Sequence, residues 1–133
     1  MKIKGLIFDL DGVLVDTKKI HFDALNIALK SIKFEQISFK DHVNIYDGLP
    51  TLEKLKILKK KHGLNKKFFP KIQKIKQIET QKLLRKNLKY NPKIFKLFSK
   101  LSKKYKICIA TNAVNKTLQV CLKKLKIKKF ILS

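Results

Sequence analysis

The sequence predicts an α/β fold in which a parallel sheet carries helices. Two short apolar runs, residues 3–8 and 105–110, have the length and composition of buried strands. Helical periodicity fills the chain between them, and a third apolar run, residues 130–132, follows another helical stretch. Strands that alternate with helices are typical of parallel sheets with right-handed crossovers.

Apolar residues recur at helical spacing in five stretches, and we expect each set to form the buried face of a helix. The sets are Ile20, Ala24, Ile27 and Ala28; Leu52, Leu55 and Leu58; Ile72, Ile75, Ile78 and Leu83; Ile94, Leu97, Phe98 and Leu101; and Leu118, Leu122 and Leu125. Asn91 followed by Pro92 predicts a helix start, because Asn caps helices and Pro suits the first helical position. Gly63 predicts a helix end, and residues 47–50 predict a turn.

The helical stretch between the first two strands is longer than one crossover needs. We interpret it as an inserted helical cap, residues 17–87, on a core formed by residues 1–16 and 88–133. With 133 residues the chain has room for one modest domain. Because the third strand is expected at the very end, the sequence predicts a core that is incomplete at its C-terminus.

The composition is strongly basic, with 33 Lys and Arg against 9 Asp and Glu and a net charge of +24. Such a charge can bind nucleic acid. However, Arg85 is the only arginine, and arginine is the residue that reads phosphates and bases in bidentate fashion. The lysines are also spread along the whole chain. We therefore favour the codon bias of an AT-rich genome as the cause and keep nucleic-acid binding as a minor hypothesis.

Other sequence features exclude several classes of protein. No apolar run approaches the roughly 20 residues that span a bilayer. The basic and then apolar start is not typical of a signal peptide, because Asp9 and Asp11 follow it without a small-residue cleavage site. We expect a cytoplasmic protein in which Cys108 and Cys121 are buried free thiols.

Polar residues follow the first two predicted strands where ligands bind in parallel sheets, beyond the carboxyl ends. Asp9 is a carboxylate at neutral pH and can attack phosphorus without a base. Repulsion between two carboxylates favours a protonated Asp11, which could donate a proton to a leaving group. An anionic nucleophile attacking phosphate needs a divalent cation, and carboxylate oxygens suit Mg²⁺. The competing interpretation is a pair of turn-forming aspartates.

Three further residues are candidates for binding phosphate. Gly12 allows a tight turn whose N–H groups can approach an anion. Thr111 and Asn112 offer a hydroxyl, an amide and backbone N–H groups at an expected helix start. They are equally suited to be the N-cap of that helix, and the two roles are compatible.

Two segments carry a resemblance to a known family. Residues 9–17, Asp-Leu-Asp-Gly-Val-Leu-Val-Asp-Thr, resemble the first motif of the haloacid-dehalogenase superfamily, and residues 107–112, Ile-Cys-Ile-Ala-Thr-Asn, resemble its second motif. The resemblance implies a Rossmann-like core with a helical cap, in the phosphatase and β-phosphoglucomutase-like branch. It implies that Asp9 is the nucleophile and a Mg²⁺ ligand. It also implies that Asp11 is the general acid/base and binds the metal through its carbonyl.

The same resemblance extends to other residues of the two motifs. It implies that Leu10, Gly12, Thr111 and Asn112 hold the phosphoryl group. The second aspartate of the first motif is typical of phosphoryl-transfer members and is usually missing from true dehalogenases. Asp11 therefore favours phosphoryl transfer over cleavage of a carbon–halogen bond.

Four more residues are candidates for substrate contacts from the expected cap or its hinge. Asp16 is one, with a helix cap and hinge anchor as the alternative. His21 is another, with a half-exposed helix histidine as the alternative. Gly48 and Thr51 bound a segment that resembles a substrate-selecting loop, and a plain turn between helices is the alternative.

These observations predict a Mg²⁺-dependent phosphohydrolase that acts on a small phosphorylated metabolite through an aspartyl-phosphate. A sugar-phosphate mutase is the nearest alternative. The family's third motif supplies a Lys and its fourth supplies acidic residues, and both are expected after the third strand. Lys128 and Lys129 precede that strand. We therefore also weigh an N-terminal fragment with little activity alone and, less favoured, a nucleic-acid binder.

Overall fold

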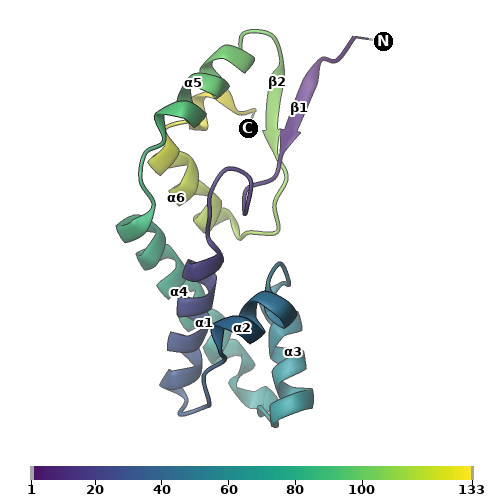
Figure 1. Cartoon of the computed structure of the whole chain (residues 1–133), viewed down its shortest axis with the longest axis vertical. Coiled ribbons are helices and arrows are strands. Elements are labelled where there is room, and N and C mark those ends of the chain that lie inside the picture. The colour runs from purple at the N-terminus through teal and green to yellow at the C-terminus, as the bar shows by residue number, and fades with distance from the viewer. Residues whose placement is uncertain (1, 133) are drawn as a thin grey trace. The chain divides into compact units, whose positions relative to one another are not determined.

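The computed structural model describes residues 2–132, and Figure 1 shows the arrangement of its helices and strands. In chain order the elements are β1 (Gly5–Phe8), α1 (Lys18–Ser31), α2 (Phe39–Asp41), the π-helix η1 (His42–Tyr46), α3 (Thr51–His62), the 3₁₀ helix η2 (Lys66–Phe68), α4 (Phe69–Asn87), α5 (Pro92–Leu101), β2 (Lys106–Ile109), α6 (Asn115–Leu125) and the 3₁₀ helix η3 (Lys128–Phe130).

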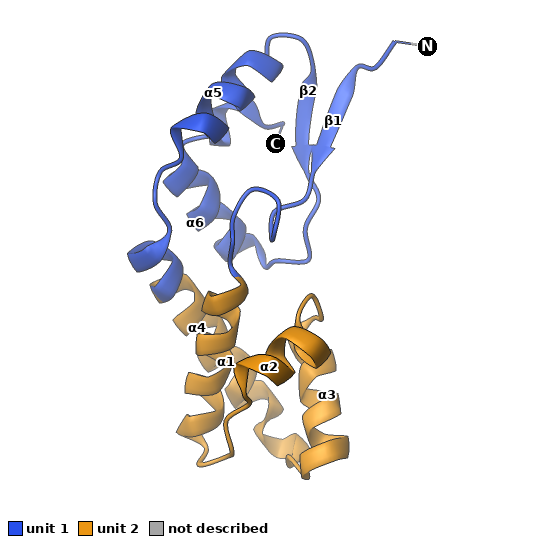
Figure 2. Cartoon of the chain, viewed as in Figure 1, with its two compact units in different colours: residues 1–17, 83–133 blue, residues 18–82 orange. Residues whose placement is uncertain are grey.

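The chain forms two compact units, which Figure 2 shows in different colours. Unit 1 contains residues 1–17 and 83–133 and holds both strands. Unit 2 contains residues 18–82 and is entirely helical among its regular elements.

A parallel pair of strands forms the sheet of unit 1. β1 and β2 run in register from the pair Gly5 and Lys106 to the pair Phe8 and Ile109. The ring of Phe8 lies 4.9 Å from that of Phe98 in α5, so the helix packs on the sheet through aromatic side chains. The predicted α/β class with a parallel sheet is confirmed.

The predicted third strand at residues 130–132 is not formed among the described residues. The chain instead makes the 3₁₀ turn η3, closed by a bond from the Ile131 N–H to the Lys128 carbonyl (3.2 Å). Only beyond this turn is the backbone extended, and there the Leu132 N–H donates to the Ile107 carbonyl of β2 (2.9 Å). The prediction placed the extended segment too early because apolar composition does not distinguish a tight turn from a strand.

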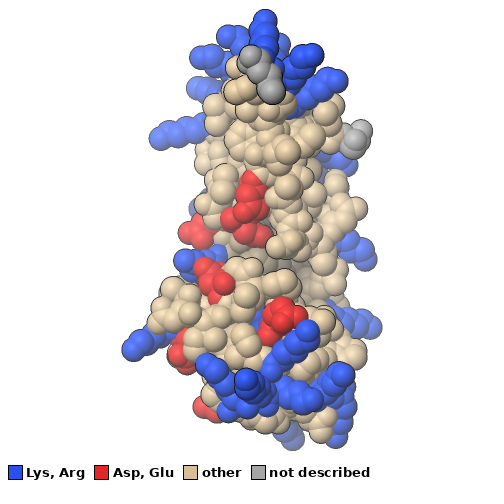
Figure 3. All heavy atoms as spheres, turned by 90° about the vertical axis from the view of Figure 1, so that its right-hand side faces the viewer, with Lys and Arg blue, Asp and Glu red and all other residues tan. Residues whose placement is uncertain are grey.

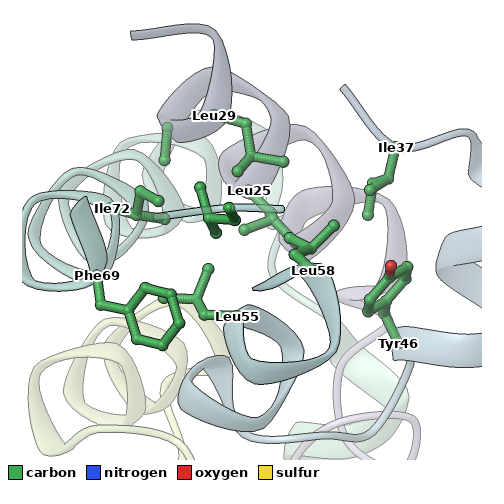
Figure 4. Packing of buried hydrophobic residues seen from close by; sticks show 10 residues of the cluster. Leu25, Leu29, Ile37, Tyr46, Leu55, Leu58, Phe69 and Ile72 are labelled. Atoms are coloured by element: carbon green, nitrogen blue, oxygen red, sulfur yellow. The ribbon is translucent and has the colours of Figure 1, made fainter. Parts of the chain in front are cut away.

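Unit 2 has its own hydrophobic core, drawn in Figure 4. Side chains from α1, α3 and α4 converge there, and Tyr46 of η1 closes one side of the cluster. Its fully enclosed members include Leu25, Leu29, Leu55 and Ile72, each with 0% of its surface exposed. Leu55, Leu58 and Ile72 were predicted to be buried, whereas Leu25 and Leu29 of α1 lie in the core without having been part of the predicted stripe.

Some members of the predicted stripes are nevertheless exposed. Ile27, Leu52, Ile78 and Leu97 expose between 40% and 47% of their surface. Leu97 in particular does not belong to the buried face of α5, where Phe98 is fully buried. Helical spacing alone does not show how wide a buried face is, because the neighbouring elements decide that width.

Local sequence signals set the ends of several helices. The Asn91 side chain accepts hydrogen bonds from the Lys93 and Ile94 N–H groups, which confirms the predicted start of α5. Gly63 adopts φ +71° and ends α3 as predicted. Residues 39–46, for which no helix was predicted, form α2 and η1, starting from a Ser38 cap. Each is too short for helical periodicity to be recognised.

On the molecular face shown in Figure 3, Lys and Arg side chains gather along the margins and over the lower part, whereas Asp and Glu side chains form a few small groups. Among the described residues, no helix combines the length and the apolar character needed to cross a membrane.

Candidate functional site

The loop after β1 is held in one compact shape by its own backbone. The Leu10 carbonyl accepts hydrogen bonds from three N–H groups, those of Val13, Leu14 and Val15. The Gly12 N–H donates to the Val15 carbonyl at 2.8 Å. Leu10 is fully buried and anchors the loop in unit 1. The aspartates on either side of Leu10 are therefore displayed on a fixed turn.

Gly12 has a conformational role in this turn. Its φ is +76°, a region that side-chain-bearing residues rarely adopt. A Cβ placed on it would meet nothing within 4 Å. Its glycine identity is therefore required by the backbone conformation, and the space beside it is open.

Asp9 lies on the exposed side of the loop. One of its carboxylate oxygens, Oδ1, accepts the N–H of Leu10 at 2.7 Å. This bond uses only part of the accepting capacity of the carboxylate, which has about four lone-pair sites. An exposed and oriented carboxylate of this kind is suited to attack a ligand or to bind a cation.

Asp11 is half-buried and has a specific partner. The hydroxyl of Thr17, itself buried, donates to Oδ1 of Asp11. Cys121 of α6 is fully buried, and burial, with a smaller contribution from the Asp11 charge, raises the pKa of its thiol to about 11. The charge of Asp11 therefore acts on a buried side chain of the helix that follows β2. The sequence analysis did not pair Thr17 with Asp11, and the Asp-x₅-Thr spacing is the signal that was missed.

Thr111 and Asn112 follow β2 at the same end of the sheet as the aspartates follow β1. Just beyond the paired strands, the Ala110 N–H donates to the Phe8 carbonyl (2.9 Å). The segments that follow β1 and β2 therefore leave the sheet side by side. The Thr111 hydroxyl accepts the Ala113 N–H at 3.0 Å and closes a small turn. The expectation that Thr111 and Asn112 cap the next helix was wrong, because the N-cap of α6 is Val114.

The remaining candidates are divided between the units. Asp16 is exposed in unit 1, next to the buried Thr17. The other three, His21, Gly48 and Thr51, belong to unit 2. His21 is half-buried on α1, Gly48 adopts φ +75° in an exposed turn, and Thr51 is the first residue of α3.

A polar cluster inside unit 2 escaped the sequence analysis. Asp47 lies 3.3 Å from the Lys18 ammonium and 3.9 Å from Nε2 of the fully buried His42. Burial, and then the charge of Lys54, lower the pKa of His42, so that its neutral form is favoured. Lys54 is also buried, with 3% of its surface exposed. Single π-helical turns are frequent at functional sites. A five-residue element is too short to show a periodic pattern in the sequence, so η1 was not predicted.

The donor set after β1 is compatible with a hard cation. Within residues 2–132, no group of three or more His, Cys, Asp or Glu side chains is arranged to hold a metal ion. Mg²⁺ commonly uses only one or two carboxylates and completes its shell with water and substrate phosphate. Asp9, exposed and with free accepting capacity, and Asp11 fit that smaller requirement.

Comparisons with known proteins agree with this architecture. Residues 6–132 match the family model described as haloacid dehalogenase-like hydrolase. A comparison with curated proteins gave no match.

Solved structures similar to the chain include a haloacid dehalogenase-like hydrolase from Streptococcus pneumoniae, with 24% identity and a TM-score of 0.77. A Haemophilus somnus protein assigned as a phosphoglycolate phosphatase has 21% identity and a TM-score of 0.77. A Thermotoga maritima protein assigned as a β-phosphoglucomutase has 26% identity and a TM-score of 0.69. Each alignment covers 97% of this chain and 59%, 60% and 59% of the respective relative.

The chain therefore spans about three fifths of the length of these structures. The family match extends from β1 through η3 and includes both segments that carry the candidate site. The chain belongs to the haloacid dehalogenase-like hydrolase family.

Proposed function

We propose that the protein is a Mg²⁺-dependent phosphohydrolase of small phosphorylated metabolites, with Asp9 as nucleophile and Asp11 as general acid and base. The observation that carries the proposal is the rigid turn after β1. It presents an exposed Asp9 carboxylate and, two residues on, an Asp11 carboxylate held by the Thr17 hydroxyl. The segment that follows β2 adds Thr111 and Asn112 as phosphate-binding residues.

The first half-reaction follows from these positions. An oxygen of Asp9 forms a bond to phosphorus while the bond between phosphorus and the ester oxygen breaks. Asp11 gives its proton to that departing oxygen, which leaves as an alcohol. The Thr17 hydroxyl keeps the Asp11 carboxyl in one orientation. The N–H groups of Gly12 and Val13 already donate to carbonyls within the loop, so we assign phosphate binding chiefly to Thr111 and Asn112.

The second half-reaction reverses the role of Asp11. Water attacks the phosphorus of the aspartyl-phosphate, Asp11 takes the proton of that water, and inorganic phosphate leaves as Asp9 is regenerated. Bound Mg²⁺, held by Asp9 and Asp11, would supply charge neutralisation between the anionic nucleophile and the phosphate. Unit 2 takes the part of a helical cap in this proposal, with His21, Gly48 and Thr51 as substrate-contacting residues and Asp16 at the hinge.

Phosphate release from a panel of phosphorylated sugars and small acids, with Mg²⁺ or with a chelator, tests the proposal. We expect Asp9→Asn to abolish the aspartyl-phosphate seen by mass spectrometry. Asp11→Asn should slow release by about 10²- to 10⁴-fold, the usual contribution of a general acid. Thr17→Val should act in the same direction but less strongly, because it only orients Asp11. Isomerised sugar phosphate in place of free phosphate would identify a mutase.

A binding measurement covers the case in which turnover is too slow to detect. The amide chemical shifts of residues 9–12 and 111–113 should change when Mg²⁺ and inorganic phosphate are added. These changes should be absent in Asp9→Asn. Unaltered shifts together with no phosphate release, or equal activity of wild type and Asp9→Asn, would overturn the assignment.

A further inference from the structure

Three aromatic rings lie in a row on the surface of unit 1. Tyr90 precedes α5, Phe95 lies in its second turn, and Phe130 ends η3. The ring centroids of Tyr90 and Phe95 are 6.0 Å apart, and those of Phe95 and Phe130 are 5.4 Å apart. Tyr90 exposes 44% of its surface, and the other two rings are half-buried. Segments 40 residues apart in sequence therefore build one aromatic surface.

Two exposed lysines lie over these rings. The Lys126 ammonium is 5.0 Å from the centroid of Tyr90. The Lys129 ammonium is 5.1 Å from the centroid of Phe95 and 5.2 Å from that of Phe130. Lys126 ends α6 in the left-handed conformation, with φ +59°, which turns the chain toward η3. We call these five residues, Tyr90, Phe95, Lys126, Lys129 and Phe130, the Tyr90 patch.

Part of this arrangement has a purely structural explanation. Asn91 is the N-cap of α5, so Tyr90 and Phe95 occupy the two positions of a hydrophobic staple, which fixes the entry of the chain into a helix. A staple needs only two apolar side chains, however. It does not require aromatic side chains or a ring that leaves 44% of its surface exposed, as Tyr90 does, nor does it account for the third ring or the two lysines.

The surroundings of the patch are exclusively basic in sequence. Residues 83–133 contain fifteen Lys and Arg residues and not one Asp or Glu. The three carboxylates of unit 1 all lie at residues 9–16, in the loop after β1. Unlike the helices of unit 2, where Glu53 and Glu79 pair with lysines, this stretch has no acidic side chains to neutralise its charge. An anionic partner is therefore favoured electrostatically.

We propose that the Tyr90 patch binds single-stranded nucleic acid, independently of the phosphohydrolase function proposed above. Unpaired bases stack on aromatic rings, and phosphates bind to lysines beside the rings. A duplex offers only its backbone to such a surface, since its bases are stacked on one another. A lipid headgroup or an acidic protein would use the lysines and leave the exposed face of Tyr90 without a planar partner.

The lysines already resting on the rings do not obstruct this binding. A cation–π contact at an exposed site is worth only about 0.5–1 kcal/mol, whereas stacking of a base on an aromatic side chain contributes about 1–3 kcal/mol. The ammonium groups can move aside to phosphates while a base takes the ring face. Arginine is not needed, because non-specific backbone binding depends on charge and not on bidentate geometry.

Fluorescence anisotropy with a labelled 15-nucleotide oligo(dT) and the full chain tests the proposal. Tyr90→Leu keeps the apolar staple but removes the aromatic ring, and we expect it to weaken binding at least about fivefold. Tyr90→Phe keeps the ring and should bind like wild type. Circular dichroism of both variants verifies that α5 is unchanged, so that a loss of binding cannot be attributed to unfolding.

A charge-matched pair of variants separates the patch from general basicity. Lys126→Gln with Lys129→Gln should weaken binding more, and flatten its salt dependence more, than Lys103→Gln with Lys104→Gln, which removes the same charge elsewhere in unit 1. A duplex of equal length should bind more weakly than oligo(dT). Equal binding by Tyr90→Leu and wild type would overturn the proposal, as would equal effects of the two lysine pairs or tighter binding to duplex or to anionic lipid vesicles.

Discussion

Cys121 lies in the core of unit 1, and its thiol is affected by the charge of Asp11 in the candidate site. Its side chain is fully enclosed on α6, and it senses the Asp11 charge as well as the loss of water. Both effects disfavour the thiolate and raise the pKa of this cysteine from its ordinary value of 9.0 to about 11. The sequence predicted a buried free thiol here, and the structure confirms it, while Cys108 is free but only half-buried.

This shift predicts a specific loss of stability at high pH. The folded state holds the Cys121 proton more tightly than the unfolded chain, so the stabilisation is complete below pH 9 and is lost as the pH rises through about 11. The loss approaches roughly 3 kcal/mol, given about 1.4 kcal/mol per pKa unit. Urea unfolding at pH 8, 9.5 and 10.5 should show wild type losing stability faster than Cys121→Ala. If the unfolding free energies of wild type and Cys121→Ala fell in parallel as the pH rose, the raised pKa of Cys121 would be contradicted. A constant difference between the two proteins is expected from the smaller side chain of alanine and would not matter.

At the scale of single elements, caps and turns decide where helices begin and end. The start of α5 could be read from Asn91 and Pro92, because the cap bonds join residues only two and three apart. The π-helix η1 and the 3₁₀ turn η3 could not be read in this way. They contain five and three residues, which is too few for a repeating apolar pattern to appear in the sequence.

The cap of α5 gives an element-scale prediction. Asn91→Ala leaves two N–H groups of the first turn without their side-chain acceptor and should cost about 1 kcal/mol of unfolding free energy, within a range of about 0.5–2. Asn91→Ser should restore most of the loss, since Ser is also a good cap. Asn87→Ala, at the exposed end of α4, is the matched control and should change stability by less than about 0.5 kcal/mol. Equal effects of the two alanine variants, measured by urea unfolding, would count against the cap.

At the scale of the whole molecule, charge is the dominant feature. A net charge of +24 on 133 residues opposes compaction through self-repulsion. This repulsion acts over a long range at low salt, because the screening length is about 30 Å at 0.01 M ionic strength. The screening length falls to about 8 Å at 0.15 M. The molecule should consequently be more stable at physiological salt than in dilute buffer.

Thermal unfolding in 10 mM and 200 mM NaCl measures this repulsion. We expect the Tm to rise with salt by about 4 °C for each kcal/mol of repulsion that is screened. Lys66→Glu with Lys67→Glu lowers the net charge by four and places acidic groups ahead of α4, where the helix dipole favours them. The Tm of that variant should rise less between 10 mM and 200 mM NaCl than the Tm of wild type. A Tm that is independent of salt in both proteins would mean that the lysines are too widely separated to repel one another.

The sequence by itself determined the fold class, the position of β1 and β2, and the candidate residues that follow them. These are local properties, since apolar runs, turn residues and the segments 9–17 and 107–112 are each continuous in the chain. Contacts between distant segments were decided only by the tertiary structure. They include the bond from Leu132 to Ile107 and the meeting of Tyr90 and Phe95 with Lys126, Lys129 and Phe130. Such contacts depend on how elements pack, and no local pattern records which surfaces will face one another.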